Sequence, residues 1–468
     1  MNAENGRRIE EICTKRMLPL IIDMSVPAVC ANIVTALYNF ADRFFVGQFV
    51  GTDALGGIGI TFPLNNITAS LTVMISIGGS TMLSRLLGEK KYIKTNNTFS
   101  NIIIMSGCIG IVLSVLFFTF TPWLVHICGA DNSSALFIPA VSYLHITSLG
   151  LVFLILNLAL ASSIRSEGNT RYALVVTLSG AVVNIILDPL TILVFHLGLE
   201  GAAVATVVSQ VMSCLCSASY FIRGNSIIKW NRKFKPEIKI MLSVLALGSA
   251  PAVFQLLSFV NNTFINHMLM SYGNADMGQG GGDLAISAVS VISSVESFAI
   301  MFIMGMNNAL SVIISYNYGC KSYARVKAAT LTGQVISLFL FLLLWIIMMF
   351  IPRQLFLLFN SRDTRLAEYG VRAVRESRLF IFGLGFQTLA SMYFSAIGNP
   401  RKATLISVSR NGLFLIPALL IIPRRFGLDG VLYSSSVSDC CSLVLVAIIY
   451  FSGIKKLERS TVNDTLHT

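Results

Sequence analysis

Charged residues are scarce in this chain, and their scarcity excludes an ordinary soluble fold. Only 12% of the 468 residues are Asp, Glu, Lys or Arg, whereas 54% are hydrophobic. A typical soluble domain carries about 25% charged residues. The length alone would predict two or three soluble domains, but so little charge cannot keep that much chain in water. The composition therefore predicts a protein whose main solvent is lipid.

The chain also lacks the motifs that mark catalytic, metal-binding and phosphate-binding sites. Its nine cysteines include no paired C-x-x-C, and Cys214, Cys216, Cys440 and Cys441 all lie in apolar stretches. Cysteines in such places behave as small apolar residues. We find no metal-ligand spacing, phosphate-binding loop or nucleophile motif. We therefore predict neither an enzyme nor a resident cofactor.

What the chain has in abundance is apolar runs of about 20 residues or more, the length that spans a bilayer. Lipid offers no water to the backbone, so runs of this length without strict alternation predict helices. We expect about twelve, near residues 17–47, 54–84, 98–121, 137–163, 172–196, 200–222, 239–271, 283–311, 326–351, 376–397, 403–423 and 429–452. The predicted fold class is an all-α polytopic membrane protein.

Basic residues gather in alternate links of this topology. They occupy both termini and the links after the second, fourth, sixth, eighth and tenth predicted helices. By the positive-inside rule, both termini are then cytoplasmic, in a multi-pass protein of the cell membrane. The exception is 352–378, which holds six Arg on the predicted outer side and which we interpret as an amphipathic outer loop or helix extension. The net charge of +12 thus reflects topology, and we expect no nucleic-acid partner.

The two halves of the sequence repeat each other. Gly-Asn followed by Arg at 168–171 recurs at 398–401, and Gly-Leu-acid-Gly at 198–201 recurs at 427–430. Further counterparts are Lys90 with Lys321 and Pro27 with Pro251. Six helices per half predict parallel repeats, related by an axis along the membrane normal. Transporters built in this way place the substrate between or within the two bundles and open alternately to each side.

This repeat predicts two pseudo-symmetric six-helix bundles. The expected order is a cytoplasmic amino terminus, a first bundle, a cytoplasmic linker, a second bundle and a cytoplasmic tail. These parts correspond to residues 1–16, 17–223, 224–238, 239–453 and 454–468.

Four acids fall inside predicted helices, where a charged side chain costs about 2.5–3.5 kcal/mol. They are Asp42, Asp188, Glu296 and Asp439. The polar residues that share a helical face are Tyr38 and Asn39 with Asp42, Asn184 with Asp188, and Thr206 with Gln210. A carboxylate beside amide and hydroxyl oxygens can hold a proton or can bind a small hard cation.

The two acids of the first half also have structural interpretations. Asp42 is followed by Arg43, and the two could form an interfacial ion pair. Asp188 precedes Pro189, and its side chain could satisfy backbone groups freed near the helix kink. Both interpretations remain open from the sequence.

The acids of the second half differ in their available partners. Asp439 has Arg410 on the preceding predicted helix at comparable depth, so a structural pair and a functional pair are both open. Glu296 has no obvious basic partner in its own helix, which favours a role facing a cavity.

Several motifs together resemble the multidrug and toxic compound extrusion family. They are Pro27, Tyr-Asn-Phe-Ala-Asp-Arg at 38–43, Arg-Ser-Glu-Gly-Asn at 165–169, Asn-Ile-Ile-Leu-Asp-Pro at 184–189 and Gly-Ala-Ala-Val-Ala-Thr at 201–206. The run Ile-Ile-Ser-Tyr-Asn-Tyr-Gly at 313–319 resembles the bacterial MepA-like branch, although Ser311-Val312 stands where that branch commonly has Gln-Pro. The resemblance covers nearly the whole chain.

The resemblance implies a monomeric antiporter in the bilayer that exports small organic, often cationic, compounds in exchange for protons or sodium ions. It implies a first-bundle ion site formed by Asp42, Asn184, Asp188, Thr206 and Asn157, which is the only metal site we expect. It places a helix bend at Pro27. The substrate-cavity candidates are Tyr38, Asn39, Gln210, Glu296 and Gln255. Some branches of the family have an acid where this chain has Gln255, so we do not expect a second-bundle ion site of that kind.

Two other functions are compatible with a many-helix membrane chain. A flippase for lipid-linked precursors, of the same broad superfamily, would need basic residues for pyrophosphate, and the embedded charges here are mainly acidic. A membrane receptor or channel fits the repeats and the buried carboxylates less well, and no filter-like sequence is present.

Overall fold

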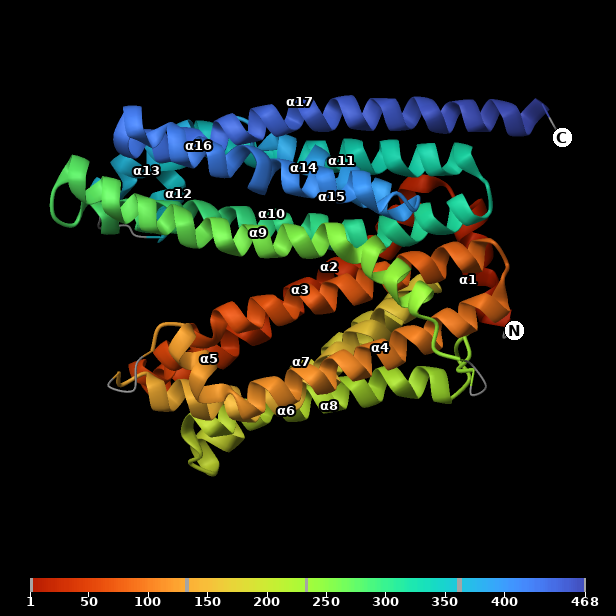
Figure 1. The fold of residues 1–468 in the computed structure, drawn as a ribbon, viewed down its shortest axis with the longest axis horizontal. Helices are drawn as coiled ribbons and strands as arrows, with labels where there is room; N and C mark the ends of the chain where they lie inside the picture. Colours follow the sequence, from red (N-terminus) through yellow and green to blue (C-terminus); the bar gives the residue numbers. More distant parts are fainter. Residues whose placement is uncertain (1–2, 131–133, 232–234, 360–363, 467–468) are drawn as a thin grey trace. The chain divides into compact units, whose positions relative to one another are not determined.

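The regular elements of this chain are helices. The computed structural model describes residues 3–130, 134–231, 235–359 and 364–466, and every regular element in these ranges is helical (Figure 1). Eleven helices are long and apolar enough to cross a membrane, and a bent pair makes a twelfth span if it is counted as one. The chain is therefore a multi-pass membrane protein, and the predicted number of spans agrees with the structure.

The chain divides into two compact units, each described here by itself. The first unit contains Met1–Gly248 and Ser311–Lys321, and the second contains Ser249–Leu310 and Ser322–Thr468. The boundary between the units at Gly248 and Ser249 lies beyond the linker expected at 224–238, of which residues 232–234 lie outside the described part. The start of one long helix and the end of the next belong to the first unit.

The first unit begins with a short helix and continues through six long ones. Its helices are α1 (Ala3–Thr14), α2 (Met17–Phe49), α3 (Thr52–Gly88), α4 (Tyr92–Thr119), α5 (Thr121–Ile127), α6 (Phe137–Ser166), α7 (Thr170–Pro189), the π-helix η1 (Leu190–Val194) and α8 (Gly198–Ile222). The first residues of α9 (Ile238–Met277) and the last residues of α10 (Gly281–Gly319) complete this unit.

The second unit holds the rest of α9 and α10 and the remaining helices. These are α11 (Tyr323–Phe350), α12 (Pro352–Phe359), α13 (Thr364–Ser377), α14 (Phe382–Ala396), α15 (Pro400–Val408), the π-helix η2 (Ser409–Phe414), α16 (Leu415–Ile421) and α17 (Pro423–Leu466). The predicted helix near 376–397 is wrong at its start, because α14 begins at Phe382 and is preceded by α13. The two helices bend by 48° at the break between them.

The Arg-rich segment 352–378 is mostly helical. It contains α12 and α13, which favours the helical alternative over a loop, whereas residues 360–363 lie outside the described part. Its position on the outer side stays a prediction.

Backbone geometry confirms the internal repeat. Three turns in each half contain a residue with positive φ at matching positions. The pairs are Lys90 (56°) with Lys321 (59°), Gly168 (82°) with Gly398 (83°), and Gly198 (56°) with Gly427 (56°). The asparagine after each middle glycine caps the next helix: Asn169 accepts a hydrogen bond from the backbone N–H of Tyr172 at 3.1 Å, and Asn399 accepts one from Lys402 at 3.4 Å.

Two glycines explain why the start of α9 packs with the first unit. A β-carbon added at Gly78 on α3 would lie 1.9 Å from the carbonyl oxygen of Val244 on α9. One added at Gly248 would lie 1.8 Å from the carbonyl oxygen of Met74 on α3. Each helix therefore presents a glycine to the other's backbone, as small residues do where membrane helices approach closely.

A buried carboxylate fixes the segment after α8 to the link between α6 and α7. The Glu167 side chain is only 2% exposed. It accepts hydrogen bonds from the Tyr220 hydroxyl at 2.9 Å, from the backbone N–H of Ile228 at 2.8 Å and from the Ser226 hydroxyl. Burial nevertheless raises the pKa of this carboxyl to about 7, because the hydrogen bonds only partly offset the loss of water.

Replacing Gly78 by Ala should lower the thermal stability of the purified protein. The new methyl group would overlap a backbone oxygen that cannot rotate away, and such overpacking costs about 1–3 kcal/mol. Gly107→Ala on α4 is the matched control, because nothing lies within 4 Å of its added β-carbon. A thermal melt monitored by size-exclusion chromatography in detergent compares the two. Equal melting temperatures would show that α3 and α9 separate without cost.

Stability should also fall between about pH 4.5 and pH 7 because of Glu167. The pKa of its carboxyl rises from 4.5 to about 7 on folding, so the folded state binds this proton more tightly. The resulting stabilisation is complete below about pH 4.5 and is lost as the pH rises through about 7. Glu167→Gln, which has no titrating proton, should show a smaller loss of melting temperature between pH 5 and pH 8 than the wild type. Glu200→Gln, at an exposed acid, should match the wild type, and an unchanged pH dependence in Glu167→Gln would contradict the assignment.

Candidate functional site

Helix α7 places an amide and a carboxylate of the first unit together. Asn184 is 2% exposed and Asp188 is fully buried. They lie four residues apart on one helical face, and the Asn184 amide donates to Oδ1 of Asp188 at 3.3 Å. The predicted pairing of these two residues is present in the structure.

Asp42 on α2 lies near this pair. Its charge interacts with that of Asp188 and with the Tyr38 hydroxyl one turn earlier on α2. Asp42 and Arg43 form no ion pair in the described part of the chain. The Arg43 guanidinium instead lies 5.8 Å from the centre of the Phe62 ring. The interfacial ion pair that the sequence left open is therefore absent.

A residue other than the Asp188 side chain donates hydrogen bonds to the backbone carbonyl groups near Pro189. Proline has no N–H to donate, and η1 begins immediately after it. The Thr191 hydroxyl lies 2.9 Å from the carbonyl oxygen of Leu187 and 3.2 Å from that of Asp188, within reach as a donor to both. The Asp188 carboxylate is thereby left for its contact with Asn184 and for a further partner.

Three acceptor oxygens of these residues are buried and accept no hydrogen bond from any residue that the structure describes. They are Oδ1 of Asp42, Oδ1 of Asn184 and Oδ2 of Asp188. A buried acceptor without a donor costs free energy unless a proton or a cation reaches it. Oxygen donors of this kind suit a small hard cation as well as a proton. No group of three or more His, Cys, Asp or Glu side chains that could hold a metal ion occurs in the described part.

Tyr143 on α6 is a residue that the sequence did not single out. It is 8% exposed and packs in a buried cluster with Val46 and Ile192. The charges of both Asp42 and Asp188 act on its hydroxyl. Its place could not be read from periodicity, because an apolar helix with one tyrosine has many equivalent faces.

The remaining first-unit candidates lie on α6 and α8. The Oε1 atom of Gln210 is buried without a donor and lies 2.3 Å from where a β-carbon of Gly150 would be. Thr206 is half-buried on the same helix. Asn157 accepts a hydrogen bond from the Ser217 hydroxyl at 3.0 Å, and no hydrogen bond links it to Asp188 in the described part. On α2, Tyr38 is half-buried and Asn39 is exposed, and Pro27 is buried within the same continuous helix.

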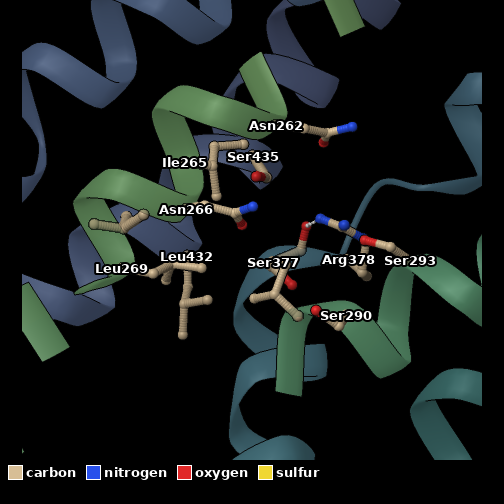
Figure 2. A pocket seen from close by; sticks show the side chains of 12 residues that line it. Asn262, Ile265, Asn266, Leu269, Ser290, Ser293, Ser377, Arg378, Leu432 and Ser435 are labelled. Atoms are coloured by element: carbon tan, nitrogen blue, oxygen red, sulfur yellow. Dashed lines mark hydrogen bonds between the residues drawn. The ribbon is translucent and has the colours of Figure 1, made fainter. Parts of the chain in front are cut away.

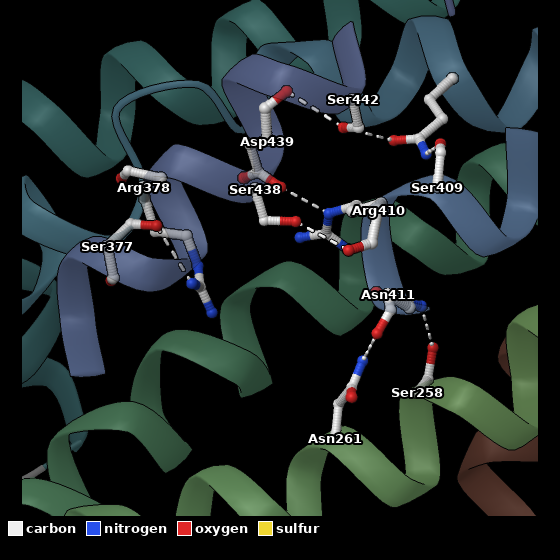
Figure 3. A network of polar contacts seen from close by, with 12 residues as sticks. Ser258, Asn261, Ser377, Arg378, Ser409, Arg410, Asn411, Ser438, Asp439 and Ser442 are labelled. Atoms are coloured by element: carbon white, nitrogen blue, oxygen red, sulfur yellow. Dashed lines mark hydrogen bonds and ion pairs between the residues drawn. The ribbon is translucent and has the colours of Figure 1, made fainter. Parts of the chain in front are cut away.

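The second unit contains the ion pair expected between Arg410 and Asp439. Nε of Arg410 donates to Oδ1 of Asp439 at 2.5 Å, and Asp439 is 4% exposed. Figure 3 shows the polar network around this pair. The Ser438 hydroxyl donates to the Arg410 carbonyl at 2.7 Å, and Ser442 donates to the Asp439 carbonyl at 3.1 Å.

The π-helix η2 explains why this network contains backbone groups. A π-helical turn breaks the regular helical hydrogen-bond pattern, and such turns often occur at functional positions. In η2 the carbonyl of Asn411 accepts from the Asn261 amide at 2.7 Å, while the Asn411 amide donates to the Ser258 hydroxyl at 3.0 Å (Figure 3). These contacts tie η2 to α9 within the second unit.

Glu296 has a basic partner that its own helix does not supply. Arg378, 82 residues further along the chain, donates from Nε and Nη2 to the two carboxylate oxygens of Glu296. Their side chains are 10% and 11% exposed. Glu296 is therefore paired with a basic residue and is not the unpaired acid that the sequence suggested. Gln255, the other second-unit candidate, is half-buried on α9.

Removing Arg410 alone should destabilise the second unit, whereas removing both charges should not. Loss of one partner leaves Asp439 buried and uncompensated, which costs about 3–5 kcal/mol. We therefore expect Arg410→Met to melt well below the wild type and Arg410→Met with Asp439→Leu to recover most of the difference. Melting in detergent micelles measures both. If the double variant melts as low as the single one, the network beyond the ion pair carries the stability.

Known relatives align with this sequence along nearly its full length. The MatE family model matches residues 27–190 and again 257–420, two stretches that begin 230 residues apart. The chain is 27% identical over 434 residues to a multidrug export protein MepA of Staphylococcus saprophyticus, covering 92% of this chain and 93% of the relative. It is 26% identical to the MepA protein of Staphylococcus haemolyticus, with 92% of each chain covered.

Solved structures share the fold at lower identity. A MATE structure in the bent conformation superposes with a TM-score of 0.89 at 21% identity, covering 97% of this chain and 99% of that one. An outward-facing multidrug resistance MATE transporter superposes with a TM-score of 0.84 at 22% identity, covering 94% and 96%. The twofold family match, the repeated turns and the two helical units agree: the chain belongs to the MatE family of membrane transporters.

Proposed function

We propose that this protein exports small organic, often cationic, compounds across the cell membrane in exchange for protons or sodium ions. The observation that carries the proposal is the set of buried acceptor oxygens on Asp42, Asn184 and Asp188 that accept no hydrogen bond. The relatives named multidrug export proteins support the choice of cargo. Both termini lie on the cytoplasmic side, and the protein works as a monomer.

The coupling ion binds where the acceptors lack donors. With no ion present, Asp42 and Asp188 repel each other and expose acceptors to an apolar surrounding, which is unfavourable. A proton or sodium ion removes both costs. Its binding therefore stabilises the conformation in which α2 and α7 hold these side chains together, and Pro27, which removes one backbone hydrogen bond from α2, lets this helix adjust.

Export follows if the ion and the cargo favour different conformations. The two units open alternately to each side of the membrane, and the ion weakens cargo binding by the same factor by which the cargo weakens ion binding. Tyr38, Asn39 and Gln210 are the first-unit side chains that we assign to the cargo. Thr206 and Asn157 support the ion site from α8 and α6.

Efflux of ethidium from loaded cells tests the proposal. We expect the wild type to export ethidium under an imposed pH or sodium gradient and Asp42→Asn to fall to the level of cells without the transporter, because the amide cannot exchange a proton or neutralise a cation. Asp53→Asn is the matched control, since Asp53 is an exposed acid in the first turn of α3. Membrane levels of the three proteins are compared by immunoblot.

Each outcome has a distinct meaning. The gradient that drives export identifies the coupling ion. If the wild type moves no ethidium under either gradient, organic-cation export is wrong, and flipping of a lipid-linked precursor becomes the better proposal. If Asp42→Asn exports as fast as the wild type, the ion site lies elsewhere.

A further inference from the structure

A cavity in the second unit is lined in part by residues at the break between α13 and α14. Its volume is about 300 Å³, and its walls come from α9, α10, α17 and the end of α13. Figure 2 shows Asn262, Ile265 and Asn266 of α9 together with Ser377 and Arg378 from the helix break. Broken membrane helices commonly line binding sites, because irregular backbone is tolerated where it faces a cavity.

The one charged side chain that lines this cavity in the described part of the chain is basic. It belongs to Arg378. Glu296, which the sequence suggested as a cavity acid for cations, is occupied by Arg378 and does not line the cavity. An organic cation would therefore meet a guanidinium here rather than a carboxylate.

Arg378 retains hydrogen-bond donors for a ligand. A guanidinium has five N–H groups. Two of them, on Nε and Nη2, bond to Glu296, and one on Nη1 bonds to the Ser377 carbonyl at 3.2 Å. One N–H on each of Nη1 and Nη2 makes no hydrogen bond in the described part of the chain. Two neighbouring N–H groups of an arginine are the donor pair that binds both oxygens of a carboxylate.

The rest of the lining divides into polar and apolar parts. The hydroxyls of Ser290 and Ser377 donate to the backbone of their own helices. Within the described ranges, the side chains of Asn262, Asn266 and Ser293 form no hydrogen bonds, so their donors are available to a ligand. The apolar lining residues are Ile265, Leu269, Val289, Val431 and Leu432. The cavity thus offers donors for a negatively charged head and an apolar surface for its body.

We propose that this cavity is a binding site for a small organic carboxylate with an apolar body. The carboxylate oxygens accept from Nη1 and Nη2 of Arg378, and the body packs against apolar side chains of α9 and α17. The Arg378 and Glu296 pair has no net charge, so the ligand adds one negative charge, and the amide and hydroxyl donors of the lining stabilise it. The size suits a small molecule, because ligand cavities range from about 300 to 1,000 Å³.

This site is separate from the proposed export of organic cations, and binding to the purified full-length protein tests it without efflux. Equilibrium dialysis in detergent micelles compares labelled benzoate with labelled benzamide, which has nearly the same shape and no charge. Specific binding to the protein is taken as the fraction of the bound label that an excess of the unlabelled compound displaces. We expect benzoate to bind at least about tenfold more tightly than benzamide, because benzoate offers two anionic oxygens to the two N–H groups of Arg378, whereas benzamide offers one neutral oxygen.

Two variants test the role of Arg378. Arg378→Gln combined with Glu296→Gln removes both charges without leaving an unpaired one, and it should reduce the preference for benzoate to about one. Arg410→Gln combined with Asp439→Asn is the matched control, because it removes the other buried ion pair of the second unit, which does not line the cavity. This control should keep the preference. Size-exclusion chromatography shows whether each variant remains folded.

Ser293→Leu keeps the ion pair and fills the cavity, and it tests the site even if the charge variants do not fold. It should abolish displaceable benzoate binding. Any of three results would overturn the proposal: wild type that binds benzoate no better than benzamide, a charge-free variant that retains the preference, or Ser293→Leu that binds benzoate like the wild type. The first result would leave the cavity filled by water alone.

Discussion

The absence of water in the hydrocarbon region is the constraint on which the rest of this structure depends. A polar group there must find its partner inside the chain, or it must receive one from outside. The hydroxyls of Thr68, Thr72 and Ser106 follow the first course and donate to carbonyls of their own helices. The functional questions concern the groups that do not.

The two units treat their buried acids in different ways. In the second unit, Glu296 and Asp439 each face an arginine, and the positive and negative charges cancel. In the first unit, Asp42 and Asp188 have no arginine partner in the described part of the chain, and each has an acceptor oxygen without a donor. Oδ2 of Asp439 also lacks a donor, but Arg410 compensates the charge of that carboxylate. A neutralised pair is stable whether or not an ion arrives. Two acids without a basic partner gain stability when a proton or a cation binds, and this difference supports the ion site that we propose in the first unit.

The internal repeat explains how such a difference can arise on one architecture. The turns at Gly168 and Gly398 keep the same positive φ and the same asparagine cap, since the chain must reverse direction at both places. Between these turns, the side chains that face the interior are free to differ. One π-helix follows Asp188 in the first unit, and the other contains Arg410 in the second. The two π-helices thus occur in both halves of the chain, but an acid precedes the first and an arginine lies in the second.

Local sequence patterns predicted the structural features that are determined by residues close together in the sequence. The spans follow from apolar runs, the turns follow from glycine and asparagine, and the Asn184 contact with Asp188 follows from helical spacing. The partner of Glu296 could not be found in this way, because Arg378 lies 82 residues away, in the break between α13 and α14. The break comes at the end of an amphipathic, Arg-rich stretch whose composition resembles a surface loop. An arginine in such a stretch enters the interior only when a buried acid compensates it. Glu296 and Arg378 therefore compensate each other's buried charge. The role of neither residue can be inferred from its neighbours in the sequence.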